Sequence, residues 1–471
     1  MTFNSVTPDF ANALAAQLSP AAVKEVSPKY VEEPRGLYHG IGGMVVAPGN
    51  TQEVSTVLRV ANEARVGVVP IGGGTGLVGG QVFPEGPAPV LLSMERMTAI
   101  RDSFPDENIL IAEAGAILQD VQEAADAVDR LFPLALASGG SCRIGGNLAT
   151  NAGGVNVLRY GNARDLCLGL EAVLPDGSIW NGLKRLRKDN TGYDLKNLLI
   201  GAEGSLGVIT AASLRLFPRP DGRCAALMIV PDPTAALQLL ALAGDRAGNV
   251  ISMFELIGQT GLQFLAETMP EVRLPFAAPP EWAVLIDLGT HGDVDPQAVL
   301  EGIFTDGFDA GLVTDGLVAQ SEGQRLEFLK VRESIPEANK RIGSIASHDI
   351  SLPAGNIAAF VKAAGQALAV LGDIRINCFG HLGDGNLHYN VFPSKGRKKQ
   401  DYPQGTTEQA RRFVHDLVAE FDGSFSAEHG VGRLKTQDLQ RYGDPTKLAA
   451  MRAIKDALDP NGIMNPGVIF A

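Results

Sequence analysis

The sequence predicts a two-domain α+β protein, and three observations support that fold class. At about 150 residues per domain, a chain of 471 residues has room for two to four units. Short apolar strands alternate with amphipathic helices along most of it. The stretch FPRPDG at 217–222 interrupts this alternation with two prolines, an aspartate and a glycine, as is typical of a domain boundary. We therefore assign residues 1–219 to a first domain, with its core at about 40–219, and residues 220–471 to a second, with the segment from about 444 to 471 returning to the first.

The helices and strands of the first domain are predicted from the spacing of apolar residues and from helix-capping residues. Apolar residues at near-helical spacing predict a short helix within 9–26. Asn50, with Glu53 three residues on, predicts the capped start of a second helix. Strands are predicted at 44–48, 66–71, 90–94, 109–115, 169–177 and 207–217.

The second domain shows the same alternation with fewer glycines. Strands are predicted at 224–230 and 281–289, with helices between them. The segment INCFGHLGDGNLHYNVF at 376–392 predicts a β-hairpin, because two apolar runs flank a Gly-Asp-Gly-Asn turn. The last helix is predicted to begin at Asp444-Pro445, a cap followed by proline, and to end at 459–462.

Composition and charge exclude several classes of protein. A formal net charge of −13 argues against nucleic-acid binding by the chain as a whole. The four cysteines are scattered without a CxxC pair, so neither a disulfide framework nor a cysteine zinc site is predicted. The N-terminus shows no signal-peptide pattern, and no apolar run reaches the about 18 residues that a membrane span needs. We expect a cytoplasmic protein with no integral membrane segment.

A glycine-rich loop, IGGGTGLVGG at 71–80, follows a predicted strand. Its Gly74-x-Gly76-x-x-Gly79 spacing formally matches the dinucleotide fingerprint, but that motif opens a helix, and three prolines in residues 81–90 leave no room for one. A Walker loop is excluded because no lysine follows the last glycine. A concave row of backbone N–H groups able to wrap a phosphate is the prediction, with an elaborate turn as the alternative.

Two further runs, 138–162 and 201–210, repeat this chemistry. Their small residues let the backbone approach a large flat ligand, and Asn147, Thr150 and Asn151 offer neutral hydrogen bonds. Three such loops in one domain predict an extended cofactor cradle.

The order and spacing of these loops resemble the FAD domain of the vanillyl-alcohol-oxidase superfamily, also called PCMH-type, and DNTGYDLKNLLIGAEGSLGVIT from Asp189 resembles the FAD-linked D-2-hydroxyacid dehydrogenases. The resemblance runs from about residue 40 to the NPG at 465–467 and implies a PCMH-type FAD domain and an antiparallel-sheet substrate domain flanked by helices. It implies that the first loop binds the pyrophosphate and that the others line the ribityl chain and flavin. Because residues 70–80 contain no His, non-covalent FAD is implied. The residues assigned to FAD are Gly72, Gly73, Gly74, Thr75, Gly76, Leu77, Gly79, Gly80, Ser138, Gly145, Gly146, Asn147, Thr150, Asn151, Gly153, Gly154, Tyr160, Glu203, Gly204, Gly207, Val208, Ile209 and Asn465.

Four of the seven histidines lie in the last quarter of the chain, and three of them, His381, His388 and His429, stand in glycine-rich segments. The predicted hairpin brings His381 and His388 across from one another. Together with Glu428, His381 and His388 would form a set of two imidazoles and one carboxylate, which is common among catalytic zinc sites, although a histidine pair is more often structural. By the resemblance, His381, His388 and Glu428 bind a divalent metal, with zinc expected and manganese or iron as alternatives, and His429 is the catalytic base.

A 2-hydroxyacid carries a carboxylate that a planar guanidinium binds bidentately, and the resemblance assigns this role to Arg332. Asn390 shares a face of the hairpin with His388 and is assigned to the same substrate site.

The distal end of the substrate is where this chain departs from the family pattern. Members that bind dicarboxylates carry a threonine four residues after the arginine and a Lys-aromatic pair before a DLSLP-like motif. Pro336 and Ser347-His348 stand at those places here. Lys340 and His348 are the donors that could compensate.

The expected function is FAD-dependent oxidation of a D-2-hydroxyacid to the 2-oxoacid, with D-2-hydroxyglutarate as the best guess and D-lactate or a longer apolar D-2-hydroxyacid as alternatives. The metal polarises the hydroxyl, His429 takes its proton and hydride passes to the flavin. The electrons would leave to an electron-transferring flavoprotein or a quinone. An oxygen-using oxidase of a carbohydrate or phenolic alcohol and a non-catalytic electron-relay subunit are rivals that the His/Glu set disfavours. A homodimer is left open.

Overall fold

A computed structural model describes residues 3–470, and the chain divides into two compact units. The first unit comprises residues 1–154, 161–219 and 428–471, and the second comprises 155–160 and 220–427. The C-terminal return to the first unit thus begins at Glu428, earlier than the predicted residue 444.

A short helix inside the first half of the sequence belongs to the second unit. This helix is α6, Val157–Tyr160. Its Arg159 donates from Nη1 to the carbonyl oxygen of Gly289 (2.7 Å) and to Oγ of Ser252 (3.0 Å), both in the second unit. These contacts are more than 90 residues away in sequence, so no local pattern could predict them.

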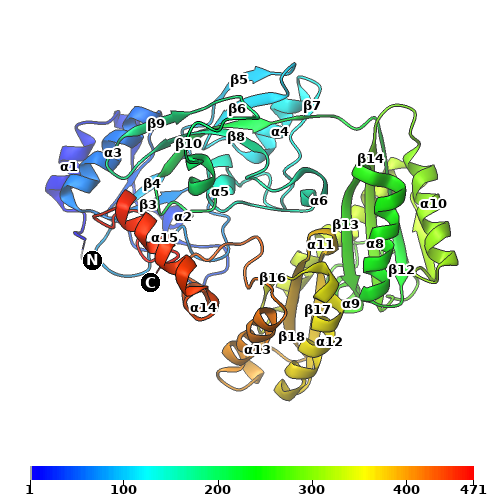
Figure 1. Ribbon diagram of the computed structural model, residues 1–471. Coiled ribbons are helices and arrows are strands. Elements are labelled where there is room, and N and C mark those ends of the chain that lie inside the picture. The colour runs from blue at the N-terminus through cyan, green and yellow to red at the C-terminus, as the bar shows by residue number, and fades with distance from the viewer. Residues whose placement is uncertain (1–2, 471) are drawn as a thin grey trace. The chain divides into compact units, whose positions relative to one another are not determined.

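The first unit contains two larger sheets (Figure 1). One has the strand order β1-β2-β4-β3, with the last three strands parallel, and the other is antiparallel with the order β5-β6-β10-β8-β9. The strands are β1 Val23–Lys24, β2 Met44–Val46, β3 Val68–Ile71, β4 Val90–Ser93, β5 Ile100–Phe104, β6 Ile109–Glu113, β7 Arg130–Leu131, β8 Cys167–Val173, β9 Ile179–Gly182, β10 Val208–Arg215 and β11 Phe217–Pro218. The helices are α1 Pro8–Ala15, α2 Pro28–Val31, α3 Thr51–Ala64, α4 Leu118–Asp126, α5 Ile144–Ala149, α7 Leu195–Leu199, α14 Thr436–Tyr442 and α15 Pro445–Leu458.

Helix boundaries in this unit follow local chemistry. Asn50 accepts from the N–H of Glu53 at the start of α3, and Asp444 caps α15 ahead of Pro445, which confirms both predicted starts. The predicted helix within 9–26 is shorter, because α1 ends at Ala15 and Pro20, which has no N–H to donate, begins a 3₁₀ turn.

The second unit is built on one seven-stranded antiparallel sheet with the order β15-β12-β14-β13-β17-β18-β16 (Figure 1). Helices α9 and α11 pack together, as do α8 and α10 and also α12 and α13. The strands are β12 Gly222–Val230, β13 Ile251–Gly258, β14 Trp282–Thr290, β15 Asp315–Val318, β16 Asp349–Ser351, β17 Ile374–His381 and β18 Asn386–Pro393. The helices besides α6 are α8 Pro233–Ala247, α9 Gln259–Thr268, α10 Pro296–Asp309, α11 Glu322–Ile342, α12 Ile357–Leu368 and α13 Thr406–Glu420.

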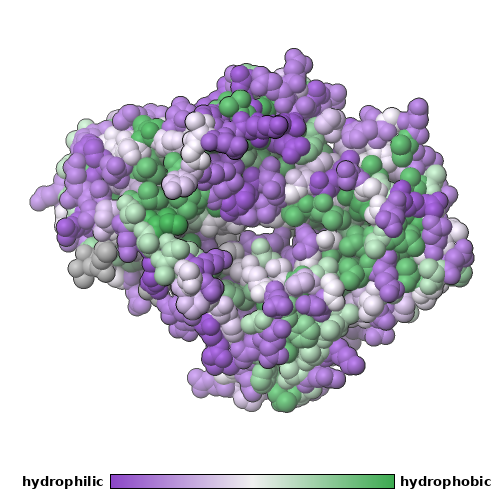
Figure 2. All heavy atoms as spheres, in the orientation of Figure 1, coloured by the Kyte–Doolittle hydropathy of each residue, from purple (hydrophilic) through white to green (hydrophobic). Residues whose placement is uncertain are grey.

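The visible surface mixes many hydrophilic side chains with smaller hydrophobic areas (Figure 2). Within the described residues, one helical segment, Ala354–Leu371, is long and apolar enough to cross a membrane by length and composition alone, and 22% of it is buried. A single segment of this kind is weak evidence for membrane insertion, because core helices of soluble proteins share the same composition.

Candidate active site

The first glycine loop leaves β3 and runs beside the second loop. A Cβ atom on Gly73 would collide with the backbone of Ser141 and Cys142, so only glycine fits there. Gly74 has a φ of +71° and no atom within 4 Å of where its Cβ would be. The loop is therefore pressed against protein on one side and open on the other, which fits a backbone cradle for a phosphate group.

The second loop enters the short helix α5, where the amide of Asn147 is buried. Asn147 is 5% exposed, and its Oδ1 is buried without a hydrogen-bond partner. A buried acceptor without a donor costs about 1–3 kcal/mol, so a ligand donor at this position would stabilise the loop. Thr150, in contrast, donates its hydroxyl to the carbonyl oxygen of Gly146 (3.0 Å).

The third loop is joined to the first by Asn465. Its Nδ2 donates to the carbonyl oxygens of Glu203 (2.7 Å) and Gly80 (3.0 Å), while its own Oδ1 is buried without a partner. The structure thus brings the three loops into one unit. Asn147 and Asn465 each hold a buried unsatisfied oxygen there, and both residues fit a polar, flat cofactor such as FAD.

Two of the residues assigned to FAD have other contacts. Glu203 is buried, and its carboxylate accepts from the N–H groups of Val431 (2.8 Å) and Gly432 (2.7 Å), so it fastens the C-terminal segment to the third loop. Burial raises the pKa of Glu203 despite those two donors. Tyr160 lies on α6 in the second unit, with the Arg159 guanidinium 4.9 Å from its ring centre.

The hairpin of β17 and β18 positions the two histidines. Phe379, rather than His381, is directly opposite His388 in the register, and His381 is the last residue of β17. Their ring centres are 5.7 Å apart in an edge-to-face arrangement. The predicted hairpin is confirmed, with a one-turn 3₁₀ segment at 382–384 and Gly385 in the left-handed region closing it.

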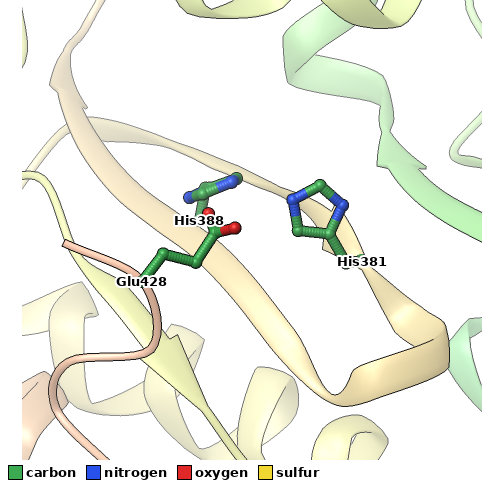
Figure 3. A group of neighbouring side chains, drawn as sticks. All are labelled: His381, His388 and Glu428. Atoms are coloured by element: carbon green, nitrogen blue, oxygen red, sulfur yellow. The ribbon is translucent and has the colours of Figure 1, made fainter. Parts of the chain in front are cut away.

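Glu428 joins these histidines at the point where the chain leaves the second unit. The preceding residue, Ala427, donates its N–H to the carbonyl oxygen of Asp349 (3.3 Å), and Asp349 is paired with His388 across β16 and β18. Potential ligand atoms of His381, His388 and Glu428 all lie within 4.8 Å of one another (Figure 3). Two imidazoles and a carboxylate at this spacing fit the donor set of a divalent transition metal.

A second group of potential ligands adjoins the first. Asp349, Glu428 and His429 also have ligand atoms within 4.8 Å of one another. Asp349 is buried and accepts from Nδ2 of Asn386 (3.0 Å). No sequence pattern had assigned a role to this carboxylate, although it directly follows Ser347 and His348 in the chain.

Glu255 is the most consequential residue that sequence analysis missed. It lies on β13 and is fully buried. Its Oε1 is 2.5 Å from Nδ1 of His381, and its Oε2 accepts from Nε of Arg332 (2.5 Å). Burial alone would raise the pKa of Glu255, but the charges of Arg332 and His381 outweigh burial and lower that pKa to about 2.

Arg332 is itself buried on α11, with its guanidinium 4.8 Å from the ring centre of Phe379. In the described part of the chain its only ion pair is with Glu255, through Nε, and its two Nη nitrogens make no hydrogen bond. The outer edge of this guanidinium is therefore the part that can bind a ligand carboxylate.

The remaining residues assigned to the substrate differ in their surroundings. Asn390 is buried, and its Oδ1 accepts from the backbone N–H of His348 (2.9 Å). The His348 ring is buried, with Nδ1 2.6 Å from the carbonyl oxygen of Tyr389. Helix α11 continues through Pro336, and Lys340 near its end is exposed.

Comparison with known proteins identifies two family models and several similar relatives. A family model described as "FAD binding domain" matches residues 43–182, and one described as "FAD linked oxidases, C-terminal domain" matches residues 219–469. The mitochondrial D-2-hydroxyglutarate dehydrogenase of Bos taurus is 37% identical over 94% of this chain and 79% of that protein. The mitochondrial D-2-hydroxyglutarate dehydrogenase of Arabidopsis thaliana is 36% identical (91% and 75%), and the D-2-hydroxyglutarate dehydrogenase of Xanthomonas citri pv. viticola is 35% identical (90% and 89%).

Solved structures share the fold at low sequence identity. Substrate-bound p-cresol methylhydroxylase superposes with a TM-score of 0.75 at 17% identity, covering 99% of this chain and 98% of that one. The 4-ethylphenol oxidase of Gulosibacter chungangensis gives 0.74 at 18% identity, covering 100% and 99%. These structural matches confirm the two-domain α+β fold class. The family models and the curated relatives confirm the family resemblance expected from the sequence. The chain therefore belongs to the family of FAD-linked oxidases and is an FAD-dependent oxidoreductase.

Proposed function

We propose that this enzyme oxidises a D-2-hydroxyacid to the corresponding 2-oxoacid, with D-2-hydroxyglutarate as the best single candidate. Several relatives that cover most of the chain carry that activity in their names. The observation that carries the proposal is the buried Arg332, whose outer guanidinium edge is available to a carboxylate. Arg332 and His381 both contact the carboxylate of Glu255.

The cofactors proposed are non-covalent FAD and a divalent metal, with zinc as the first candidate. When bound, FAD supplies a two-electron acceptor and the metal supplies a Lewis acid for the substrate hydroxyl. The three glycine loops and Asn465 would hold the FAD, and His381, His388 and Glu428 would hold the metal. Because residues 70–80 contain no histidine, acid precipitation should leave the flavin in the supernatant.

We assign the residues of the chain to three tasks. Arg332 binds the C1 carboxylate and orients the adjacent carbon. Asn390 helps to position the substrate from β18. His429 accepts the hydroxyl proton, which prepares the carbon-bound hydrogen to leave as hydride.

The distal end of the substrate favours a second candidate, D-lactate or a longer apolar D-2-hydroxyacid. By the family resemblance, Pro336 and Ser347 stand where polar donors are expected in members that take D-2-hydroxyglutarate, and Lys340 is exposed. The ring of His348 is buried, with Nδ1 at the carbonyl oxygen of Tyr389. A distal carboxylate buried without a donor would be costly to desolvate.

The test is a substrate panel with a dye acceptor, comparing kcat/KM for D-2-hydroxyglutarate, D-malate, D-lactate and D-2-hydroxyisocaproate with that for each L-enantiomer. We expect a strong preference for the D-series. Lys340→Ala should weaken the dicarboxylates if this lysine serves the distal end. Turnover of phenolic alcohols with oxygen and none of these acids would overturn the proposal in favour of an oxidase, and no turnover of any kind would favour an electron-relay subunit.

The physiological acceptor is proposed to be an electron-transferring flavoprotein or a quinone. A relative from Saccharomyces cerevisiae, 32% identical over 91% of this chain and 86% of that protein, is named a D-2-hydroxyglutarate–pyruvate transhydrogenase. Pyruvate therefore belongs in the acceptor assay. Reoxidation of the flavin by pyruvate at a rate matching turnover would replace both proposed acceptors.

A further inference from the structure

The carboxylate of Glu255 connects two groups that the proposed function places at different ends of the reacting carbon. One oxygen contacts Nδ1 of His381, a proposed metal ligand, and the other accepts from Nε of Arg332, the proposed carboxylate-binding residue. The three residues come from β17, β13 and α11, and Glu255 is the register partner of His381. Glu255 is fully buried, so solvent does not screen these contacts.

A second buried acid–arginine pair in the same unit shows what is unusual about Glu255. Asp287 on β14 receives Nε (2.6 Å) and Nη2 (3.0 Å) of Arg325, so both carboxylate oxygens are used by one guanidinium. Arg325 precedes Arg332 on α11 by seven residues, two helical turns. Arg325 also donates from Nη1 to Glu322 (2.8 Å), but both oxygens of Asp287 serve one arginine, whereas Glu255 binds Arg332 through one oxygen and keeps the other for His381.

We propose that Glu255 is a positioning residue that fixes His381 for metal binding and Arg332 for substrate binding at the same time. This inference rests on the proposed function, because it assumes a metal at His381 and a carboxylate at Arg332. Nothing in the family match or the names of the relatives assigns a role to this residue.

The contact to His381 acts through the tautomer of the imidazole. A carboxylate 2.5 Å from Nδ1 holds a proton on that nitrogen, so Nε2 carries the lone pair that a metal needs. The same contact fixes the rotation of the ring, which lies edge-to-face with His388.

The contact to Arg332 acts through the orientation of the guanidinium plane. Glu255 takes Nε, and the ring of Phe379 supports the plane at 4.8 Å. The two Nη nitrogens, which make no hydrogen bond among the described residues, remain as a fork for a carboxylate. Phe379 is also opposite His388 in the hairpin, so one aromatic side chain supports both halves of the arrangement.

Glu255→Gln tests this role in the full-length holoenzyme, with metal affinity as the first readout. A carboxamide has one acceptor oxygen, and its NH₂ group must face either the Arg332 donor or the His381 nitrogen. We expect the zinc dissociation constant, measured by chelator competition, to rise by about 10- to 100-fold while the flavin content stays unchanged. At saturating zinc, KM for the best D-2-hydroxyacid should rise as well, because the guanidinium is no longer held.

A second variant guards against misfolding around an unpaired arginine. The double variant Glu255→Met/Arg332→Met removes both charges together. Proteins often tolerate the replacement of a whole buried ion pair by apolar residues. Its zinc affinity should fall at least as far as in Glu255→Gln, because methionine offers Nδ1 of His381 no oxygen acceptor.

Asp287→Asn is the matched control, because it also leaves a buried arginine on α11 facing an amide. It should lower stability without changing zinc affinity or KM. If Glu255→Gln and the double variant bind zinc as tightly as the wild type, the inference is overturned while the proposed function stands. If Asp287→Asn lowers zinc affinity equally, Glu255 is only structural. A wild-type enzyme that binds no metal overturns this inference and the proposed metal cofactor, but not the oxidation of a D-2-hydroxyacid.

Discussion

His429 follows a proposed metal ligand directly, yet we assign it the role of base. His429→Asn should lower kcat by roughly 10²- to 10⁴-fold, the usual loss when a positioned proton acceptor is removed. Metal and flavin content, measured on the same sample, should remain near wild type. His291→Asn, at a half-exposed histidine, is the control for a histidine substitution in general. Loss of metal from His429→Asn would show instead that His429 is a ligand, as its grouping with Asp349 and Glu428 would allow.

Arg332 should bind the C1 carboxylate, which all 2-hydroxyacids share. Arg332→Lys keeps the positive charge but loses the planar fork, so kcat/KM should fall by roughly tenfold or more for every acid in the panel. Arg325→Lys, on the same helix but with its guanidinium already bonded to Asp287 and Glu322, is the control. A loss confined to dicarboxylates would place Arg332 at the distal end and contradict its assignment.

Single residues also show where sequence reasoning stops. His381, His388 and Glu428 could be predicted because a hairpin pattern and rare residue types marked them. Glu255 could not, because its partners are 77 and 126 residues away in sequence. The available signal was a lone acid in the apolar run ISMFELIG, since a carboxylate in a buried strand needs a partner.

The first glycine loop should depend on its close approach to the second loop. Gly73→Ala would place a methyl group against the backbone of Ser141 and Cys142, at a position where no rotamer change can relieve the clash. Overpacking of this kind costs about 1–3 kcal/mol, so we expect the dissociation constant of FAD to rise by roughly tenfold or more. Flavin fluorescence on titration of the apoprotein would measure it.

Gly244→Ala, in α8, is the control for that substitution, because nothing lies within 4 Å of its Cβ position. It should leave FAD affinity unchanged and stabilise α8 slightly. Unaltered FAD binding by Gly73→Ala would show that the first loop does not form the cradle.

Glu171 links three elements of the first unit and should make its stability depend on pH. Its Oε1 accepts from Thr51 at the start of α3 (2.6 Å), Thr210 in β10 (2.9 Å) and Arg101 in β5 (3.0 Å). Burial raises the pKa of Glu171, but these donors outweigh burial and the net shift is downward. Its contribution to stability is thus present above the ordinary pKa of a glutamate and is lost as the pH falls through the lower folded value.

Glu171→Gln should therefore lower the free energy of unfolding by about 1–3 kcal/mol at neutral pH and by less in acid. Urea unfolding of both proteins at about pH 7 and about pH 3 would measure the difference. An equal gap at both pH values would mean that the charge of Glu171 contributes nothing.

At the level of elements, features set by neighbouring residues could be predicted from the sequence, whereas features set by contacts between distant residues could not. The Asn50 and Asp444 caps and the β17–β18 hairpin follow from a few adjacent residues, and the structure has all three. The seven-stranded sheet joins strands that are far apart in sequence, and its order could not be read from periodicity. Pro336 could have ended α11, yet the helix continues to Ile342.

For the molecule as a whole, the two-domain fold class was predicted from chain length, the alternation of strands and helices and the break at 217–222, and the family from the three glycine loops. Comparison with known proteins confirmed both. The chain path was harder to predict. Residues 155–160 belong to the second unit and residues 428–471 to the first, through contacts that only the folded protein shows. The cytoplasmic location stays a prediction, and a homodimer stays open.

The most direct test of the account is anaerobic reduction of the bound flavin by D-2-hydroxyglutarate, measured as the loss of flavin absorbance in the visible range. The measurement is made before and after the metal is removed with a chelator. We predict rapid bleaching of the flavin by the D-enantiomer, none by the L-enantiomer, and none after chelation although FAD remains bound. Undiminished bleaching by a metal-free enzyme would contradict the metal-assisted mechanism. No bleaching by any D-2-hydroxyacid would contradict the proposed function itself.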